Sequence, residues 1–417
     1  MWFGGSSRSR GPVSLTFDAG TVPSRPRARV PLPPAFRPAL GPPNSENAVR
    51  PRRAPAFLLS LVLLLAACGD GEPDEPDEVA QADDVEGPEE EGVSTDEDVD
   101  VDDDNEGGDE PAEPEVDPAD VDANELGEVP VLMYHRILPD GGSEYDLTPE
   151  EFREELQYLY DNDYRPIRTD QFVSGDLDVP AGTTPVVLTF DDSTREQFAY
   201  DDDGEIDPDT AVGIMLDFAE EHDDFDATGS FYVLGSLFGV SAEAGADKLR
   251  HLHELGFELG NHTLTHERLD RLDAEGIQRE LAQGAENVTD AVDDAEVTTM
   301  SLPLGIWPED RELAARGSYD GYEYEHDGIL LVGSNPSPSP FHAEFDGLAI
   351  PRIRSLPMSS WDADAQEDMF TSGYWFDVFE QSPERRYVSD GNPDTISFPE
   401  ELGDQLSEEH EDRANPY

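Results

Sequence analysis

Downstream of residue 129, short apolar runs alternate with segments whose apolar residues recur at a helical period. The runs at 129–137 (VPVLMYHRI) and 185–190 (PVVLTF) have the β-branched, apolar composition of buried strands. Between them, TPEE at 148–151 marks a helix start, because Thr caps, Pro fits the first turn and Glu can complete a capping box. Strands that alternate with helices predict an α/β fold over 129–417, built as a parallel sheet or a (β/α) barrel.

The rest of this domain continues the alternation. Helices are expected at 211–221, 248–255, 274–287 and 309–316, and strands at 228–234, 257–259, 297–304, 329–332 and 348–353. We expect one catalytic domain from these elements, without internal repeats.

The charge of the chain excludes one class of partner. Its 97 Asp and Glu residues outnumber its 26 Lys and Arg residues, for a net charge of -71, and Lys248 is its single lysine. A phosphate backbone needs a basic surface, so nucleic acid is excluded as a partner. This halophilic type of acidic surface fits a salt-rich setting, where ions screen self-repulsion.

Residues 49–68 have the layout of a secretory signal. Two arginines precede the apolar run APAFLLSLVLLLAA, which is short for a transmembrane helix. The run ends in LAACG, which resembles a bacterial lipobox and implies lipidation of Cys68 after cleavage. The predicted location is the extracellular face of the cell membrane, held by this anchor; a plain signal peptide or an uncleaved anchor are the alternatives.

The segments on either side of the signal have no core-forming pattern. Residues 1–48 are rich in Pro and Arg, and we expect them to be non-structured or a start-site error, with translation beginning near Val49. Residues 69–128 are nearly all Asp, Glu, Pro, Gly, Val and Ala, which predicts a disordered acidic linker that holds the domain away from the membrane. A regulatory acidic tail is the alternative.

Candidate chemistry follows the ends of two strands. TFD ends one run and is followed by a second acid, so that Asp191 and Asp192 would project differently, one toward a metal and one free as a base. GNHTLTH at 260–266 follows another strand and carries two histidines four residues apart, which a helical turn would place on one face. The alternatives without a metal are an ordinary acidic loop at 191–192 and an ordinary polar turn at 260–266. One carboxylate with two imidazoles is, however, a common ligand set of catalytic zinc. With Cys68 the only cysteine, any metal must be held by His, Asp or Glu.

These motifs resemble those of the polysaccharide deacetylases, carbohydrate esterase family four. TFDD at 189–192, GNHTLTH at 260–266 and LPLG at 302–305 are similar to the family's first three motifs, and MYH at 133–135 is similar to membrane-attached, lipoprotein-type members. The resemblance covers roughly 129–399. It implies a distorted (β/α) barrel that binds a divalent metal, usually zinc.

The resemblance also implies roles for individual residues. Asp192, His262 and His266 would hold the metal, with Zn expected and Co or Ni as alternatives. Asp191 would be the general base. A backbone N–H near Leu304 would stabilise the oxyanion.

The chain departs from the family pattern at several positions. Ser301 stands where the family has an arginine that orients the base, and we predict that Arg352 replaces it, a surface arginine being the alternative. The later motif that supplies the acid is not evident; His135 is our preferred catalytic acid and His342 the second candidate. Ser193 replaces the usual glycine.

Further residues near these motifs carry weaker expectations. The acidic insertion at 193–208 is predicted to be a lid over the substrate cleft. Its D-x-D-G pattern makes a calcium-binding loop the alternative. Trp307 and Tyr324 are candidates for stacking on a sugar, or core residues.

The predicted function is metal-dependent removal of N-acetyl groups from an extracellular or cell-surface polysaccharide. A different amide or an O-acetyl ester is one alternative, and a catalytically inactive carbohydrate-binding lipoprotein is another. The retained Asp191 favours an enzyme, since a binder would not need a free base beside the metal. The glycan, the metal used in vivo and the oligomeric state stay open.

Overall fold

The computed structural model describes residues 116–143, 145–333, 335–358 and 371–417. Its main sheet is parallel and has eight strands, in the order β12-β9-β8-β7-β6-β2-β14, with β5 paired to β6 beside this path. The strands are β2 Val131–Tyr134, β5 Tyr164–Ile167, β6 Thr184–Asp191, β7 Ser230–Val233, β8 Glu258–Asn261, β9 Thr299–Ser301, β12 Gly328–Leu330 and β14 Ile353–Arg354.

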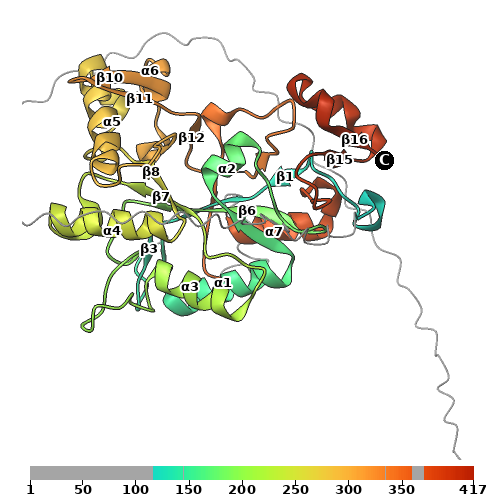
Figure 1. Cartoon of the computed structure of the whole chain (residues 1–417), viewed down its shortest axis with the longest axis horizontal. Coiled ribbons are helices and arrows are strands. Elements are labelled where there is room, and N and C mark those ends of the chain that lie inside the picture. Colours follow the sequence, from blue (N-terminus) through green and yellow to red (C-terminus); the bar gives the residue numbers. More distant parts are fainter. Residues whose placement is uncertain (1–115, 144, 334, 359–370) are drawn as a thin grey trace, which may run out of the picture. The chain divides into compact units, whose positions relative to one another are not determined.

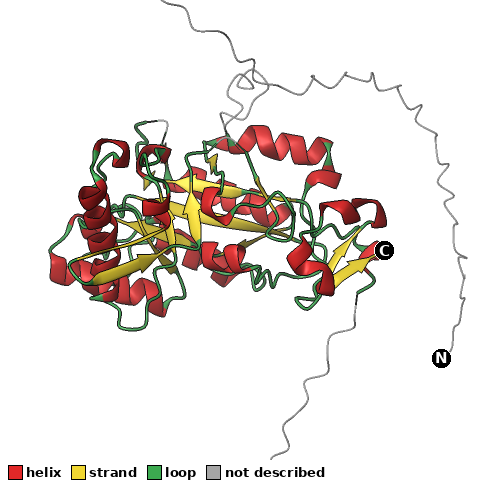
Figure 2. Ribbon diagram, turned by 90° about the horizontal axis from the view of Figure 1, so that it is seen from above, coloured by secondary structure: helices red, strands yellow, loops and turns green. Residues whose placement is uncertain are grey.

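The two edges of this sheet are joined by one short segment. Ile350 forms a parallel bridge with Leu330 of β12, and three residues later β14 pairs with β2. Residues 350–354 therefore run from one edge of the curled sheet to the other. This is the distorted (β/α) barrel predicted from the sequence, and Figure 2 shows its strands inside a layer of helices.

The strands are buried on both faces, as parallel strands usually are. In β2 and β6, Leu132 and Leu188 pack outward in one core cluster with helix residues, while Val131 and Val187 pack in a second cluster with Ile350. This two-residue alternation follows from the geometry of a strand.

Helices form the outer layer. They are α1 Pro149–Asp161, α2 Thr169–Ser174, α3 Ala211–Glu221, α4 Ala242–Glu254, α5 Ala274–Thr289, α6 Glu312–Ala315 and α7 Ser372–Gln381. Thr148 caps α1 in a capping box with Glu151, as predicted. In Figure 1, α1 and α3 lie together on one side of the strands, and the hairpin of β10 Arg316–Tyr319 and β11 Tyr322–Glu325 lies against α5. No helix among the described residues combines the length and the apolar run that a membrane crossing needs.

Order begins earlier than the predicted boundary at residue 129. Glu125 is buried, and its carboxylate accepts hydrogen bonds from the Tyr387 hydroxyl at 3.1 Å and the Ser397 N–H at 2.7 Å. These partners lie near the C-terminus, so contacts distant in sequence order an acidic segment that looks disordered by composition. The end of the linker at 128 was therefore placed too late. The rest of it, residues 1–48, the signal at 49–68 and Cys68 lie outside the described residues.

Some element boundaries also differ from the sequence prediction. The expected strand at 297–304 ends at Ser301, because Pro303–Gly305 forms a 3-10 turn, and the expected strand at 348–353 begins instead as the 3-10 turn Gly347–Ala349. The expected helix at 309–316 is short and leads into the unpredicted hairpin. Asp320 and Gly321 form its turn with φ of 50° and 94°, the left-handed pair for which Asp-Gly is suited.

Candidate active site

Two acids leave the end of β6 in different directions. Asp191 is its last residue and is 3% exposed. Asp192 and Ser193 follow with left-handed backbones, at φ of 80° and 43°. This turn leaves the Asp191 carboxylate in the interior and brings Asp192 to a partly exposed position on the rim.

The GNHTLTH segment is a polar loop and not a helical turn. Its Asn261 side chain accepts the Thr263 N–H at 2.9 Å, and the Thr263 hydroxyl accepts the His266 N–H at 3.0 Å. Thr263 and His266 both have positive φ, at 72° and 59°. These turns, and not the helical face that the four-residue spacing suggested, bring the rings of His262 and His266 to 5.0 Å between centroids.

Three side chains from these two strand ends converge, and we call them the donor cluster: Asp192, His262 and His266. One ligand atom of each lies within 4.8 Å of the others, and Asp192 Oδ1 is 3.5 Å and 3.7 Å from the Nε2 atoms of His262 and His266. The Nδ1 of His262 lies 2.8 Å from the Ser301 carbonyl, a contact in which it donates and leaves Nε2 as the ligand atom. Two imidazole nitrogens and one carboxylate oxygen fit a divalent transition metal.

Beside the donor cluster, Asp191 forms a buried ion pair with Arg352. The guanidinium approaches both carboxylate oxygens at 2.8 Å, and neither side chain is more than 4% exposed. Arg352 also donates to the Leu331 carbonyl and to the hydroxyls of Thr189 and Ser301. Ser301 in turn donates to Asp191 at 3.0 Å, so the small side chain at this position bridges the pair. The predicted partner is in contact with Asp191; its catalytic role stays a prediction.

The charges at this site favour ionised carboxylates. Burial by itself raises the pKa of Asp191, but the charge of Arg352 and then that of His262 outweigh it and hold this pKa well below its usual range. Burial also raises the pKa of Asp192, and the hydrogen bond and charge of His262 bring it below its ordinary value. Both carboxylates are therefore ionised at neutral pH.

Residues 178–322 match a family model described as polysaccharide deacetylase. This part of the chain is similar to the polysaccharide deacetylase family. Its members are carbon–nitrogen hydrolases of carbohydrate esterase family four, generally with a divalent metal, and this chain is an enzyme of that class.

Individual relatives are distant. The chain is 23% identical over 237 residues to YxkH of Bacillus subtilis, named a polysaccharide deacetylase, a match that covers 56% of this chain and 74% of the relative. It is 26% identical over 129 residues to a chitooligosaccharide deacetylase of Sinorhizobium fredii, covering 31% of this chain and about half of that protein, 51%. Among solved structures, the deacetylase PplD of Streptococcus pyogenes has 17% identity and a TM-score of 0.43, over 58% of this chain and 98% of the other.

The two histidines considered as the catalytic acid lie in different places. His135 follows β2, with its ring 5.0 Å from that of Tyr145, and the amide of Gln197 donates to the carbonyls of His135 and Asp191. Burial lowers the pKa of His135, although the nearby charge of Asp191 opposes the shift. His342 instead contacts Gln405 near the C-terminus, at 3.3 Å. Of the two candidates, His135 is the one whose charge interacts with the site.

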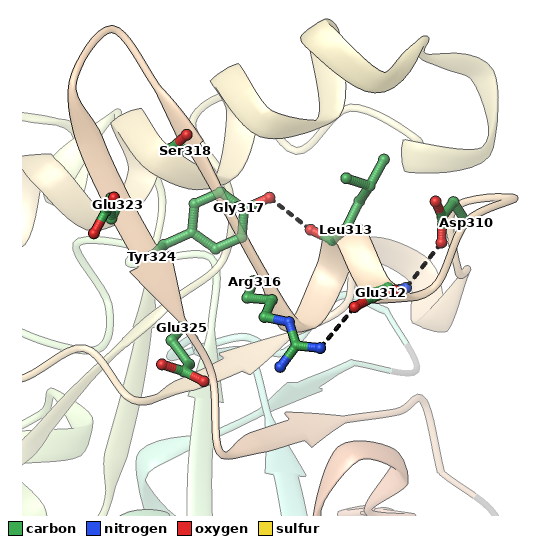
Figure 3. A pocket seen from close by; sticks show the side chains of 9 residues that line it. All are labelled: Asp310, Glu312, Leu313, Arg316, Gly317, Ser318, Glu323, Tyr324 and Glu325. Carbon is green, nitrogen blue, oxygen red and sulfur yellow. Dashed lines mark hydrogen bonds and ion pairs between the residues drawn. The ribbon is translucent and has the colours of Figure 1, made fainter.

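The remaining predicted residues, Leu304, Trp307 and Tyr324, divide between the surface and the core. Leu304 is 56% exposed and left-handed, with φ of 58°, in the turn after β9. Trp307 is partly buried under the guanidinium of Arg311, 4.7 Å from its ring centroid. Tyr324 is a core residue: its hydroxyl donates to the Leu313 carbonyl at 2.6 Å. Tyr324 also lines a cavity of about 720 Å³, whose lining residues come from residues 310–325 and do not include the donor cluster. Figure 3 shows these side chains.

The acidic insertion at 193–208 turns back on itself. Tyr200 and Ile206 form an antiparallel bridge, and the carboxylate of Asp201 accepts the N–H groups of Asp203 and Glu205. Within the described ranges, the donor cluster is the only group of three His, Cys, Asp or Glu side chains that lie close enough together to hold a metal ion. The calcium loop is therefore not supported, and the lid stays a prediction.

Several residues that hold the site together had no sequence signal of their own. Glu280 of α5 accepts both the N–H and the hydroxyl of Thr265, which fastens the histidine loop to a helix. Gly333 leaves room for the backbone at Arg352, because a Cβ there would lie 1.4 Å from the Arg352 carbonyl oxygen. Both contacts join segments far apart in the chain, so no local sequence pattern marks Glu280 or Gly333.

Proposed function

We propose that this chain removes N-acetyl groups from an extracellular polysaccharide, with a divalent metal, zinc in the first instance, at the donor cluster. The observation that carries the proposal is the buried, ionised Asp191, held by Arg352 next to three converging metal-ligand side chains. A protein that only bound carbohydrate would have no use for a desolvated carboxylate with its own arginine. The names of the relatives, polysaccharide and chitooligosaccharide deacetylases, support the substrate class.

In this proposal the residues of the chain divide the work of amide hydrolysis. Asp192, His262 and His266 would hold the metal, which when bound would act as a Lewis acid and lower the pKa of a neighbouring water. A water of lowered pKa is needed because Asp191, with its own low pKa, is a weak base. Asp191 accepts the proton as the water oxygen bonds to the acetyl carbon, and Arg352 keeps this carboxylate ionised and oriented.

The second half of the reaction needs a donor for the oxyanion and an acid for the amine. We assign the first to a backbone N–H at Leu304, whose left-handed turn follows β9. We assign the second to His135, which takes up the proton that Asp191 accepted from the water and passes it to the amine nitrogen as the C–N bond breaks. Because burial lowers the pKa of His135, this residue starts neutral and must receive a proton during the reaction.

The test is acetate release by the full chain in high salt with zinc, from N-acetylglucosamine oligomers and from peptidoglycan. Asp191→Asn and His262→Ala should abolish release, and only the second should also lose zinc binding by calorimetry. Asp226→Asn is the matched control, an exposed acid ahead of β7 at the other end of the strand. Tight zinc binding without acetate release from either glycan would indicate another acyl substrate; neither zinc binding nor release would indicate an inactive carbohydrate binder.

We further propose that the enzyme is anchored by lipid on Cys68 at the extracellular face of the membrane. The basic flank, the apolar run and LAACG support this, and a halophilic surface suits an exposed location. Labelled fatty acid should appear in the full chain and be lost in Cys68→Ser. Equal labelling of both would refute the anchor.

A further inference from the structure

A cavity of about 510 Å³ lies on the same rim as the donor cluster. Its walls come from the loop after β6, with Arg195 and Tyr200, from the turn after β7, with Phe238, and from α4, with Lys248. Because β6 and β7 are parallel neighbours, the loops that follow them leave at the same end as Asp192. The hydroxyl of Ser193 accepts the Leu234 N–H at 3.1 Å and ties these two loops together.

The cavity contains the chain's only lysine, in a costly position. Lys248 is 5% exposed; its ammonium donates to the Phe198 carbonyl at 2.6 Å and lies 5.1 Å from the ring centroid of Phe238. Burial, and then the charge of Arg195, lower its pKa to about 8. A buried lysine beside a second cation is unfavourable without an anion.

In such an acidic protein, it is unusual that Arg195 and Lys248 have no carboxylate as an ion-pair partner among the described residues. Acidic residues outnumber basic ones by 97 to 26, yet among the described residues no carboxylate forms an ion pair with Arg195 or Lys248. Asp247 also lines the cavity, but its carboxylate is paired with Arg250. The cavity therefore keeps an uncompensated positive charge in a chain of net charge -71.

The walls around these cations suit a sugar. Tyr200 and Val240 are exposed at 38% and 44%, and Phe238 holds a left-handed backbone with φ of 50°. Left-handed residues other than glycine cost free energy and gather at functional sites. Aromatic and apolar surface next to a cation is the combination that binds a sugar ring with an anionic substituent.

We propose that this cavity is a specificity subsite for a carboxylate-bearing sugar next to the N-acetyl sugar that reacts. The carboxylate contacts Arg195 and Lys248, while the ring packs on the exposed surfaces of Tyr200 and Val240. The subsite rests on the proposed deacetylase function for its neighbouring sugar, but its binding can be measured separately.

The first experiment measures binding to the full chain in high salt, by NMR titration with glucuronate and with glucose as the neutral match. Glucuronate should bind at least tenfold more tightly than glucose, and Arg195→Gln should remove this preference. A direct contact in a partly buried cavity is screened less by salt than an exposed pair. Arg316→Gln, an exposed arginine of β10, is the matched control and should leave it intact. Lys248→Met is a second variant that should also remove the preference. If the Lys248→Met protein does not fold, Arg195→Gln alone still tests the proposal.

The second experiment compares acetate release from a hyaluronan tetrasaccharide, which alternates glucuronate with N-acetylglucosamine, and from chitotetraose. Arg195→Gln should raise KM for the first about tenfold and leave the second unchanged. Preferential glucuronate binding that is lost in Arg195→Gln, without acetate release from either glycan, would uphold the subsite and refute the deacetylase. Equal binding of glucuronate and glucose, or an unchanged preference in Arg195→Gln, would overturn the subsite.

Discussion

Removing the guanidinium of Arg352 should destabilise the protein far more than removing an exposed one. In Arg352→Met, the Asp191 carboxylate stays buried and keeps the Ser301 hydroxyl, but loses both guanidinium contacts at 2.8 Å. Breaking a buried ion pair from one side costs about 3–5 kcal/mol, because the remaining charge is left uncompensated. Arg316→Met is the control: its partner Glu312 is exposed, and such pairs are worth about 0–1 kcal/mol.

The assay is urea unfolding of the full chain at fixed high salt, without added metal. Asp191→Asn and the double variant Asp191→Asn/Arg352→Met complete a cycle, in which the double variant should cost less than the sum of the two single ones. Salt should change the cost of Arg352→Met little, since a buried pair is poorly screened. A cost below about 1 kcal/mol, equal to that of the control, would refute the buried, energetically coupled pair.

Three other predictions follow from buried groups of the same domain. Burial raises the pKa of Glu155 from 4.5 to about 7, so the neutral carboxyl group stabilises the fold fully below pH 4.5. About 3 kcal/mol of the free energy of unfolding should be lost as the pH rises through the folded pKa of about 7. Glu155→Gln should flatten this pH dependence when unfolding is measured from pH 5 to 8. Gly333→Ala should lower stability by about 3 kcal/mol or more in urea unfolding, because its Cβ overlaps the Arg352 carbonyl, and a loss below 0.5 kcal/mol would contradict that contact. Arg352→Met should raise the pKa of Asp191 and move the acid limb of the pH–rate profile to higher pH; an unmoved limb would mean that Asp191 is not the base.

The sequence predicted the parts of the fold that depend on local pattern. The helix at 211–221 was placed at its observed bounds, and the strand ending in TFD was correct to within a residue or two at each end. The buried strand β5, the short helix α2 and the helix α7 were missed. Each is short or has a weak period, and its burial depends on partners far away in the chain.

The candidate site shows the same division. Asp191, Asp192, His262 and His266 could be found because residues after parallel strands gather at one edge of a sheet. Arg352 was inferred from a gap, the absence of an arginine at 301, and not from any pattern around it. Its contact with Asp191 spans 161 positions, and the cavity of Arg195 and Lys248 joins three separate elements. Periodicity carries no information about such contacts.

Backbone strain explains why the residue types were easier to predict than their geometry. Two members of the donor cluster, Asp192 and His266, are left-handed, as are Thr263 between the histidines and Leu304 on the neighbouring turn. Each such residue costs of order 1–3 kcal/mol relative to a relaxed backbone, so other contacts must hold it in place. For His266 that contact is the Thr263 hydroxyl, which no rule on metal spacing would include. The polar residues of GNHTLTH therefore have separate tasks: the histidines provide the donors, and the residues between and before them impose the backbone that brings those donors together.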